Sequence, residues 1–188
     1  MIDKLETTTM KFLTLFIIAI STCVGQINYF VLPTDSAIEL TYKMKGDSFV
    51  DNFALPKKIN GRTYVQRIRK YSFNLSDTAY FRQDDKNFYA STNPKKNIEY
   101  IEIPKTIALG KVWYNNDSTW TFVIKEVDAT LVTPISKYEH LIAIEARQPT
   151  QKNNQFLNYL NYYAREIGYV GSIVNGQLLN YLTNIKRK

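Results

Sequence analysis

Residues 38–45 read Ile38-Glu39-Leu40-Thr41-Tyr42-Lys43-Met44-Lys45, an alternation of apolar and polar side chains. Successive side chains of a β-strand point to opposite faces of the sheet. The alternation therefore predicts a strand with one buried and one solvated face, which is common in antiparallel sheets.

The same period extends along the chain. In residues 120–125 the apolar side chains of Trp120, Phe122 and Ile124 alternate with their neighbours, and residues 138–146 form a nearly unbroken apolar run. Such a run is expected of a strand covered on both faces. Residues 155–167 fit a helical or a strand face, and their tyrosine content favours a strand.

Turn residues separate the apolar runs. Asn175-Gly176 lies between residues 168–173 and 178–185, and Asn-Gly supplies the two positive-φ residues of a type I′ hairpin turn. We expect Asn60-Gly61 to lead into a strand over 63–71, and residues 84–87 to join 79–82 with 88–90. The sequence thus predicts a mostly β fold: a single-domain curved antiparallel sheet or an open barrel or sandwich with a C-terminal hairpin.

Residues 10–26 have the three parts of an export signal. Lys11 precedes a short apolar run, and small residues precede a cleavage point between Gly25 and Gln26. The apolar run is about half of the roughly 20 residues that a membrane-spanning helix needs. We expect residues 1–25 to be an N-terminal extension and cleaved signal peptide, with translation starting at Met1 or Met10.

The predicted mature chain divides into a single β domain over 26–185 and a disordered basic tail over 186–188. Its composition, 45% hydrophobic and 14% aromatic, is that of a folded chain. The only cysteine is Cys23, so the mature chain has no disulfide, which suits a bacterial periplasm or cell surface. Lipid anchoring at Cys23 is an alternative, not favoured because the bulky Thr22 precedes that cysteine.

Five short segments, in this order, carry a resemblance across most of the mature chain. They are residues 29–33 (Tyr-Phe-Val-Leu-Pro), 60–64 (Asn-Gly-Arg-Thr-Tyr), 80–82 with 88–89, 109–113 (Leu-Gly-Lys-Val-Trp) and 162–170. Their order resembles the uncharacterised exported β-rich proteins of Gram-negative bacteria, which are often lipoproteins. The resemblance implies a curved antiparallel sheet or open barrel and offers no catalytic residues. The chain departs from that group in lacking a good lipidation site, and in having Tyr-Glu-His-Leu at 138–141.

His140 is the only histidine, and the mature chain has no cysteine. A His/Cys metal cluster and a cysteine nucleophile are therefore excluded, and we predict no catalytic residue, metal ligand or cofactor. Because His140 is in phase with Ile142 and Ile144, we expect it to cap the inner face of a strand near the rim.

Carboxylate pairs leave a hydrolase as one alternative, because paired carboxylates perform acid and base catalysis in glycosidases. The candidate pairs are Asp84/Asp85, Glu99/Glu102 and Glu126/Asp128. We expect the first pair to initiate a turn, and the second pair to fall on opposite faces of one strand.

Arg67 and Arg69 share one face of their predicted strand. A positive stripe there would suit phosphate, anionic lipid or an acidic glycan. The simpler interpretation is a solvated edge strand that its charges protect against sheet-to-sheet pairing. An exported address argues against nucleic acid as the partner.

Trp113, Trp120, Tyr162 and Tyr163 combine an apolar body with a polar tip, and a curved sheet would place such residues along a groove for a lipid, glycan or peptide. Filling of the core explains them equally well. The sequence favours an exported bacterial envelope protein with a non-catalytic binding or structural role. Its partner would be a hydrophobic ligand, a glycan or another envelope protein. The alternatives are a carrier with a cavity lined by aromatic residues, and the carboxylate-based hydrolase.

Overall fold

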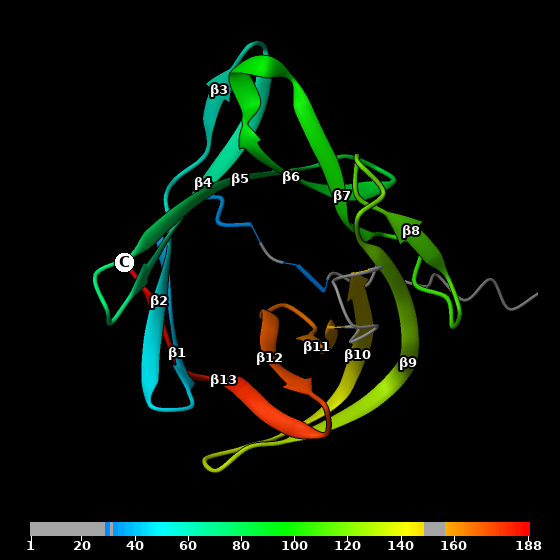
Figure 1. Ribbon diagram of the computed structural model, residues 1–188. Coiled ribbons are helices and arrows are strands. Elements are labelled where there is room, and N and C mark those ends of the chain that lie inside the picture. The colour runs from blue at the N-terminus through cyan, green and yellow to red at the C-terminus, as the bar shows by residue number, and fades with distance from the viewer. Residues whose placement is uncertain (1–28, 31, 149–156) are drawn as a thin grey trace, which may run out of the picture.

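The computed structural model describes residues 29–30, 32–148 and 157–188, which form thirteen strands and one short 3-10 helix (Figure 1). The predicted export signal and Cys23 lie outside the described residues. The first strands are β1 Ile38–Met44, β2 Asp47–Phe53, β3 Lys57–Ile59, β4 Arg62–Tyr71, β5 Ser76–Gln83, β6 Asn87–Asn93 and β7 Ile98–Pro104, with the helix η1 Pro94–Lys96 before β7. The remaining strands are β8 Val112–Tyr114, β9 Thr121–Val132, β10 Lys137–Gln148, β11 Leu157–Ala164, β12 Gly168–Val174 and β13 Gln177–Arg187.

The sheet curves into a nearly closed barrel (Figure 1). Its strand order is β7-β6-β5-β4-β2-β1-β13-β12-β11-β10-β9-β8, with β3 paired to β4. Consecutive strands are thus neighbours in the sheet, apart from β3, which pairs with β4 alone, and from β7 and β8, which are the two edges. The pairing of β1 with β13 joins the two halves. All pairings are antiparallel, so the predicted open barrel is confirmed, and the segment around 155–167 forms the strand β11.

Local turn chemistry fixes the hairpins. Asn175 and Gly176 have φ of 50° and 76°, and Asn60 and Gly61 have 48° and 77°, the left-handed conformations that the two positions of a type I′ turn require. Between β5 and β6 the Asp84 carboxylate accepts hydrogen bonds from two backbone amides within the turn, at 2.9 and 3.0 Å. These turns were predicted from the sequence, and they set the register of the strands they join.

The barrel has one seam, between β7 and β8, where no backbone pairing joins the two edges among the described residues. The connection between them is held to the sheet on both sides. The amide of Lys105 donates to the carbonyl of Lys86 at 2.8 Å, and the amide of Gly110 donates to the carbonyl of Ile124 at 2.8 Å. The connection is therefore bonded to the turn before β6 at one end and to β9 at the other, while β7 and β8 do not pair with each other.

The segment before β1 crosses one end of the barrel (Figure 1). Phe30 is buried and packs against Phe81 and Phe88, with ring centroids 5.1 and 5.5 Å apart. Tyr29 is buried at the turn between β11 and β12, where Arg165 donates a hydrogen bond to its hydroxyl at 3.4 Å. This end of the barrel is therefore covered by the chain itself.

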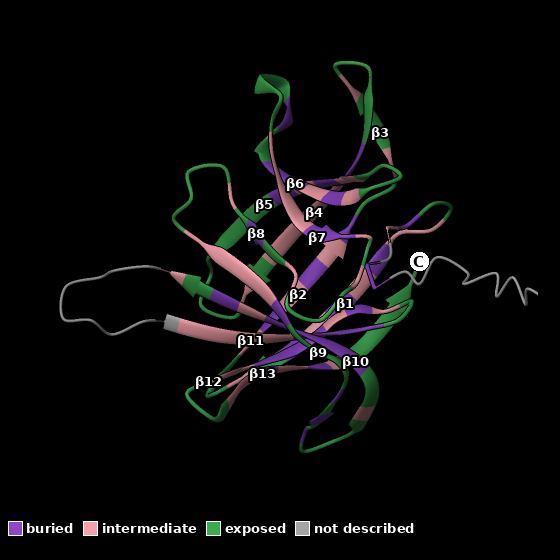
Figure 2. Cartoon of the chain, turned by 90° about the vertical axis from the view of Figure 1, so that its right-hand side faces the viewer, coloured by how far each residue is buried: buried purple, intermediate pink, exposed green. Residues whose placement is uncertain are grey.

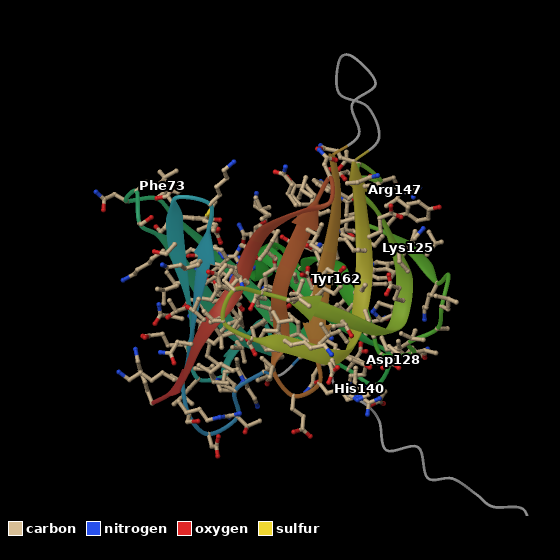
Figure 3. The ribbon with its side chains drawn as sticks, turned by 90° about the horizontal axis from the view of Figure 1, so that it is seen from below. Phe73, Lys125, Asp128, His140, Arg147 and Tyr162 are labelled. Carbon is tan, nitrogen blue, oxygen red and sulfur yellow. The ribbon has the colours of Figure 1, made fainter. Side chains whose placement is uncertain are left out.

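The far ends of β9 and β10 cross the outside of β12 and β13 (Figure 3). A Cβ at Gly171 would lie 3.0 Å from Leu131 of β9 and 2.6 Å from the carbonyl oxygen of Asn180, so only glycine fits there. The hydroxyl of Tyr138 donates to the backbone of Leu182 at 3.3 Å. This layer buries both faces of β10 over residues 141–144, as the apolar run predicted. Buried residues gather in the middle of the strands, while many of the loops at the rims are exposed (Figure 2).

Two sequence predictions about strand positions are wrong. His140 does not cap the inner face: its side chain is 78% exposed, because a bulge between Tyr138 and Leu141 breaks the period and gives His140 a φ of 56°. The basic tail is not disordered, since β13 continues to Arg187, which pairs with Ile38 of β1.

None of the helices in the described part of the chain has the length and apolarity to cross a bilayer.

Candidate ligand cavities

Two adjoining cavities lie along the inner face of the sheet. The first has a volume of about 270 Å³, and the second, at the seam, has about 680 Å³. Glu102 of β7 and Asn161 of β11 line both, so the cavities meet at these two residues. The larger falls in the range of about 300–1,000 Å³ that is usual for small-molecule sites.

Aromatic residues form much of the wall of the first cavity. They come from strands on opposite sides of the barrel and from the segment that covers its end: Phe30, Tyr42, Phe53, Phe81, Tyr163 and Tyr169. Tyr42 stacks on Phe49 with ring centroids 4.6 Å apart, and its hydroxyl donates to the backbone of Tyr169 at 3.0 Å. These contacts fix the rings in place, so the cavity is formed by a packed wall.

A buried ion pair lies on this wall. Asp51 of β2 and Arg69 of β4 are cross-strand neighbours, and the guanidinium donates to both carboxylate oxygens at 2.7 and 2.8 Å. The Asp51 side chain is only 4% exposed. Burial disfavours the charged guanidinium, but the bonds to Asp51 outweigh it and raise the pKa of Arg69 above its ordinary value. Arg69 also lies over the ring of Phe49, 4.3 Å from its centroid.

Arg67 lies two residues earlier on the same inner face. One of its terminal nitrogens donates to Asp77 of β5 at 2.8 Å, while its Nε is buried without a hydrogen-bond partner in the described structure. The shared face of Arg67 and Arg69 is confirmed. The solvated edge strand is wrong: β4 pairs with β2 and β5, and both arginines line the first cavity.

Glu102 differs from the two carboxylates that pair with Arg67 and Arg69. Asp51 and Asp77 each accept a hydrogen bond from an arginine, whereas Glu102 has no hydrogen bond or ion pair with any described residue. Burial raises the pKa of Glu102 above its ordinary value, and the charges of Arg67 and Arg69 offset this only in part. Glu102 is therefore an unpaired carboxylate at the junction of the two cavities.

Together with burial, the negative charge of Glu102 raises the pKa values of two nearby tyrosines. Burial together with the charge of Glu102 raises the pKa of Tyr100 to about 12, and the same two causes raise the pKa of Tyr163 well above its ordinary value. Tyr100 is on β7 and Tyr163 is on β11, across the cavities. The carboxylate thus faces aromatic residues from both sides of the seam.

The second cavity is lined by acidic residues, although the protein as a whole is basic. The chain has 24 lysines and arginines against 17 acidic residues. Yet among the described residues that line the second cavity there is no lysine or arginine, while Glu102 and Asp117 supply two carboxylates. Its aromatic residues are Tyr100, Trp120, Phe122 and Tyr159. Ring centroids of Trp120 and Tyr159 are 6.0 Å apart, so a cluster of aromatic rings lines an acidic cavity.

Four of the six residues proposed from the sequence as ligand-binding line these cavities. Arg67, Arg69 and Tyr163 line the first cavity, and Trp120 lines the second. Trp113 lines neither: it is buried and stacks on Phe122 with ring centroids 5.5 Å apart.

Tyr162 is also absent from both walls. It is buried opposite Gly171 and Ala143 on the outer face of β11, beneath the layer formed by β9 and β10. From the sequence, Asp51 was not proposed as a site residue, and Glu102 was proposed only as one half of the carboxylate pair Glu99/Glu102. Their signal was present, since Glu102 shares the phase of Ile98 and Tyr100 on its strand.

The candidate carboxylate pairs do not come together in a cavity. Glu99 and Glu102 lie on opposite faces of β7, as expected, and Glu99 accepts hydrogen bonds from Arg82 at 2.6 Å and from Tyr64 at 2.5 Å. Asp84 holds a turn, where its slight burial is outweighed by hydrogen bonds from two backbone amides, which lower its pKa to about 2. Asp128 contacts the exposed His140 at 2.8 Å (Figure 3). In the described part of the chain no three His, Cys, Asp or Glu side chains are grouped to hold a metal ion.

No protein-family model matches the chain, and no curated protein matches it in sequence. One solved structure is similar: a Bacteroides fragilis protein, provisionally described as exported and as having a YmcC-like fold. Its identity with this chain is 14% and the TM-score is 0.49, over 84% of this chain and 99% of that chain. At this level of similarity no property passes from that protein to this one.

Proposed function

We propose that this is an exported bacterial envelope protein that binds, without catalysis, a small ligand with an apolar body inside its barrel. The export part rests on residues 10–26 of the sequence. The binding part is supported by one observation above others: two cavities meet at Glu102 and Asn161, and the larger one lies at the unpaired seam between β7 and β8. A barrel whose role is only structural has no need of such space.

The walls favour a ligand that is mostly apolar. Aromatic and aliphatic side chains supply much of the lining of both cavities, and charged and amide side chains such as Arg67, Glu102 and Asn161 project among them. This is the usual composition of a small-molecule site. The seam supplies a route of entry, since strands β7 and β8 have no hydrogen bonds to each other that a ligand would have to break.

The test begins with protein exported by its own leader. Native mass spectrometry of that protein is expected to show a chain that begins at Gln26 and carries a retained small molecule. After the ligand is extracted, the neutral apolar probe N-phenyl-1-naphthylamine is expected to bind with saturation.

A pair of variants locates the binding. Asn161→Phe fills the junction of the cavities and is expected to weaken probe binding, whereas Thr130→Phe at an exposed position of β9 leaves it unchanged. The absence of both a retained molecule and saturable probe binding would contradict the proposal, and so would equal binding by the two variants.

A further inference from the structure

We infer that the second cavity binds an organic cation, with an ammonium group held between the Glu102 carboxylate and the faces of Tyr100, Trp120 and Tyr159. This rests on the proposed function and names the chemical class of its ligand. The apolar part of such a ligand would lie against Phe122 and extend past Asn161 toward the first cavity.

The charges of the interior support a cation over an anion. Arg69 is satisfied by both oxygens of Asp51, and Arg67 is bound to Asp77. Arg67 and Arg69 thus each have a carboxylate partner, although Nε of Arg67 has none, and Glu102 forms no hydrogen bond or ion pair with any described residue. Glu102 is half-buried and lines both cavities, so a cation bound beside it gains a carboxylate partner that no described protein group already occupies.

The aromatic residues support the same ligand class independently. An ammonium group is attracted to the face of an aromatic ring within about 6 Å of its centroid, most strongly to tryptophan. Tyr100 from β7, Trp120 from the turn before β9 and Tyr159 from β11 all line the second cavity. No lysine or arginine is among the described residues that line this cavity, and the positive charges that act on Glu102, those of Arg67 and Arg69, belong to the wall of the first cavity.

The test compares three ligands with the same chain and different head groups: decyltrimethylammonium, decanol and decanoate, each below its micelle-forming concentration. They compete with N-phenyl-1-naphthylamine on the exported protein after extraction. The Glu102 carboxylate and the aromatic rings attract the cationic head group and not the hydroxyl, so the cation is expected to compete about tenfold or more better than decanol, and decanoate worse. Equal competition by the cation and the alcohol would overturn the inference.

Variants assign the effect to residues. Glu102→Gln keeps the shape of the side chain and is expected to abolish the preference for the cation while leaving decanol binding unchanged. Glu126→Gln, an exposed carboxylate of β9, serves as the matched control and is expected to retain the preference. Trp120→Leu is expected to weaken cation binding about two- to fivefold more than decanol binding.

The outcomes separate the two proposals. A preference that persists in Glu102→Gln would overturn the inference, even if the cation binds best. Failure of the probe to bind at all would contradict the proposed function itself. Saturable probe binding without selectivity among the three head groups would leave the proposed function standing and refute only the cation site.

Discussion

Replacement of Asp51 by asparagine breaks the ion pair at the wall of the first cavity. Asp51 accepts two hydrogen bonds from Arg69, at 2.7 and 2.8 Å, and the two side chains are 4% and 20% exposed. The amide that replaces the carboxylate would offer one neutral oxygen in place of two charged ones. The guanidinium would then stay buried with its charge uncompensated.

The expected cost follows from that burial. Removal of one partner of a buried pair costs about 3–5 kcal/mol, because the remaining charge has lost its counter-charge. Asparagine keeps the shape and one acceptor, so we expect the lower end, about 3 kcal/mol. For a chain of this size each kcal/mol lowers Tm by about 2–4 °C, which gives a decrease of about 6–12 °C.

Urea unfolding and calorimetry measure this change, with Asp77→Asn as the matched control. Asp77 pairs with Arg67 at 2.8 Å but is 46% exposed, so its loss is expected to cost about 1 kcal/mol or less. The double variant Asp51→Asn/Arg69→Met removes the stranded charge and should recover most of the lost stability. If Asp51→Asn and Asp77→Asn destabilised the fold equally, by less than about 1 kcal/mol, the buried-pair account would be wrong.

Three further predictions concern single positions. The folded protein raises the pKa of Glu102, so its contribution to stability is full below the unfolded pKa, near about 4.3, and is lost as the pH rises through the folded pKa. Glu102→Gln is therefore expected to be more stable than the parent at neutral pH and equal to it in acid, and urea midpoints that are independent of pH would contradict this. Gly171→Ala is expected to lose about 1–3 kcal/mol, because its Cβ would lie 2.6 Å from the carbonyl of Asn180; an unchanged midpoint would refute the close packing. His140→Ala is expected to change stability by less than about 0.5 kcal/mol in the same assay, since the side chain is exposed; a large loss would argue for a buried role.

The parts of the fold that are determined by residues adjacent in the sequence were predictable. Asn175-Gly176 demands its turn wherever the hairpin lies, and the alternation in residues 38–45 identifies a strand without reference to its partners. His140 shows the limit of this reasoning. One bulge shifts the phase of β10, and a bulge depends on how the strand bends over its neighbours.

The site was predictable only in part, because the face of each strand that lines the interior is decided only when the sheet closes into a barrel. Period-two spacing puts Arg67 and Arg69 on one face, yet only the strand order shows that this face lines the cavity. In the sequence Trp113 and Trp120 are equally good candidates for ligand contacts; both stack on Phe122, but only Trp120 lines the second cavity. Closure of the barrel brings residues 102 and 161 together, and no local pattern contains that contact.

Quenching of Trp120 by a ligand reports directly whether an organic cation occupies the second cavity. In the variant Trp113→Phe, Trp120 is the only tryptophan, and it lines the larger cavity. An alkylammonium that carries bromine on its chain quenches tryptophan only on contact. Binding in the second cavity is expected to give saturable quenching that decyltrimethylammonium reverses. Quenching that rises in proportion to concentration without saturation, and that the competitor does not reverse, would contradict it.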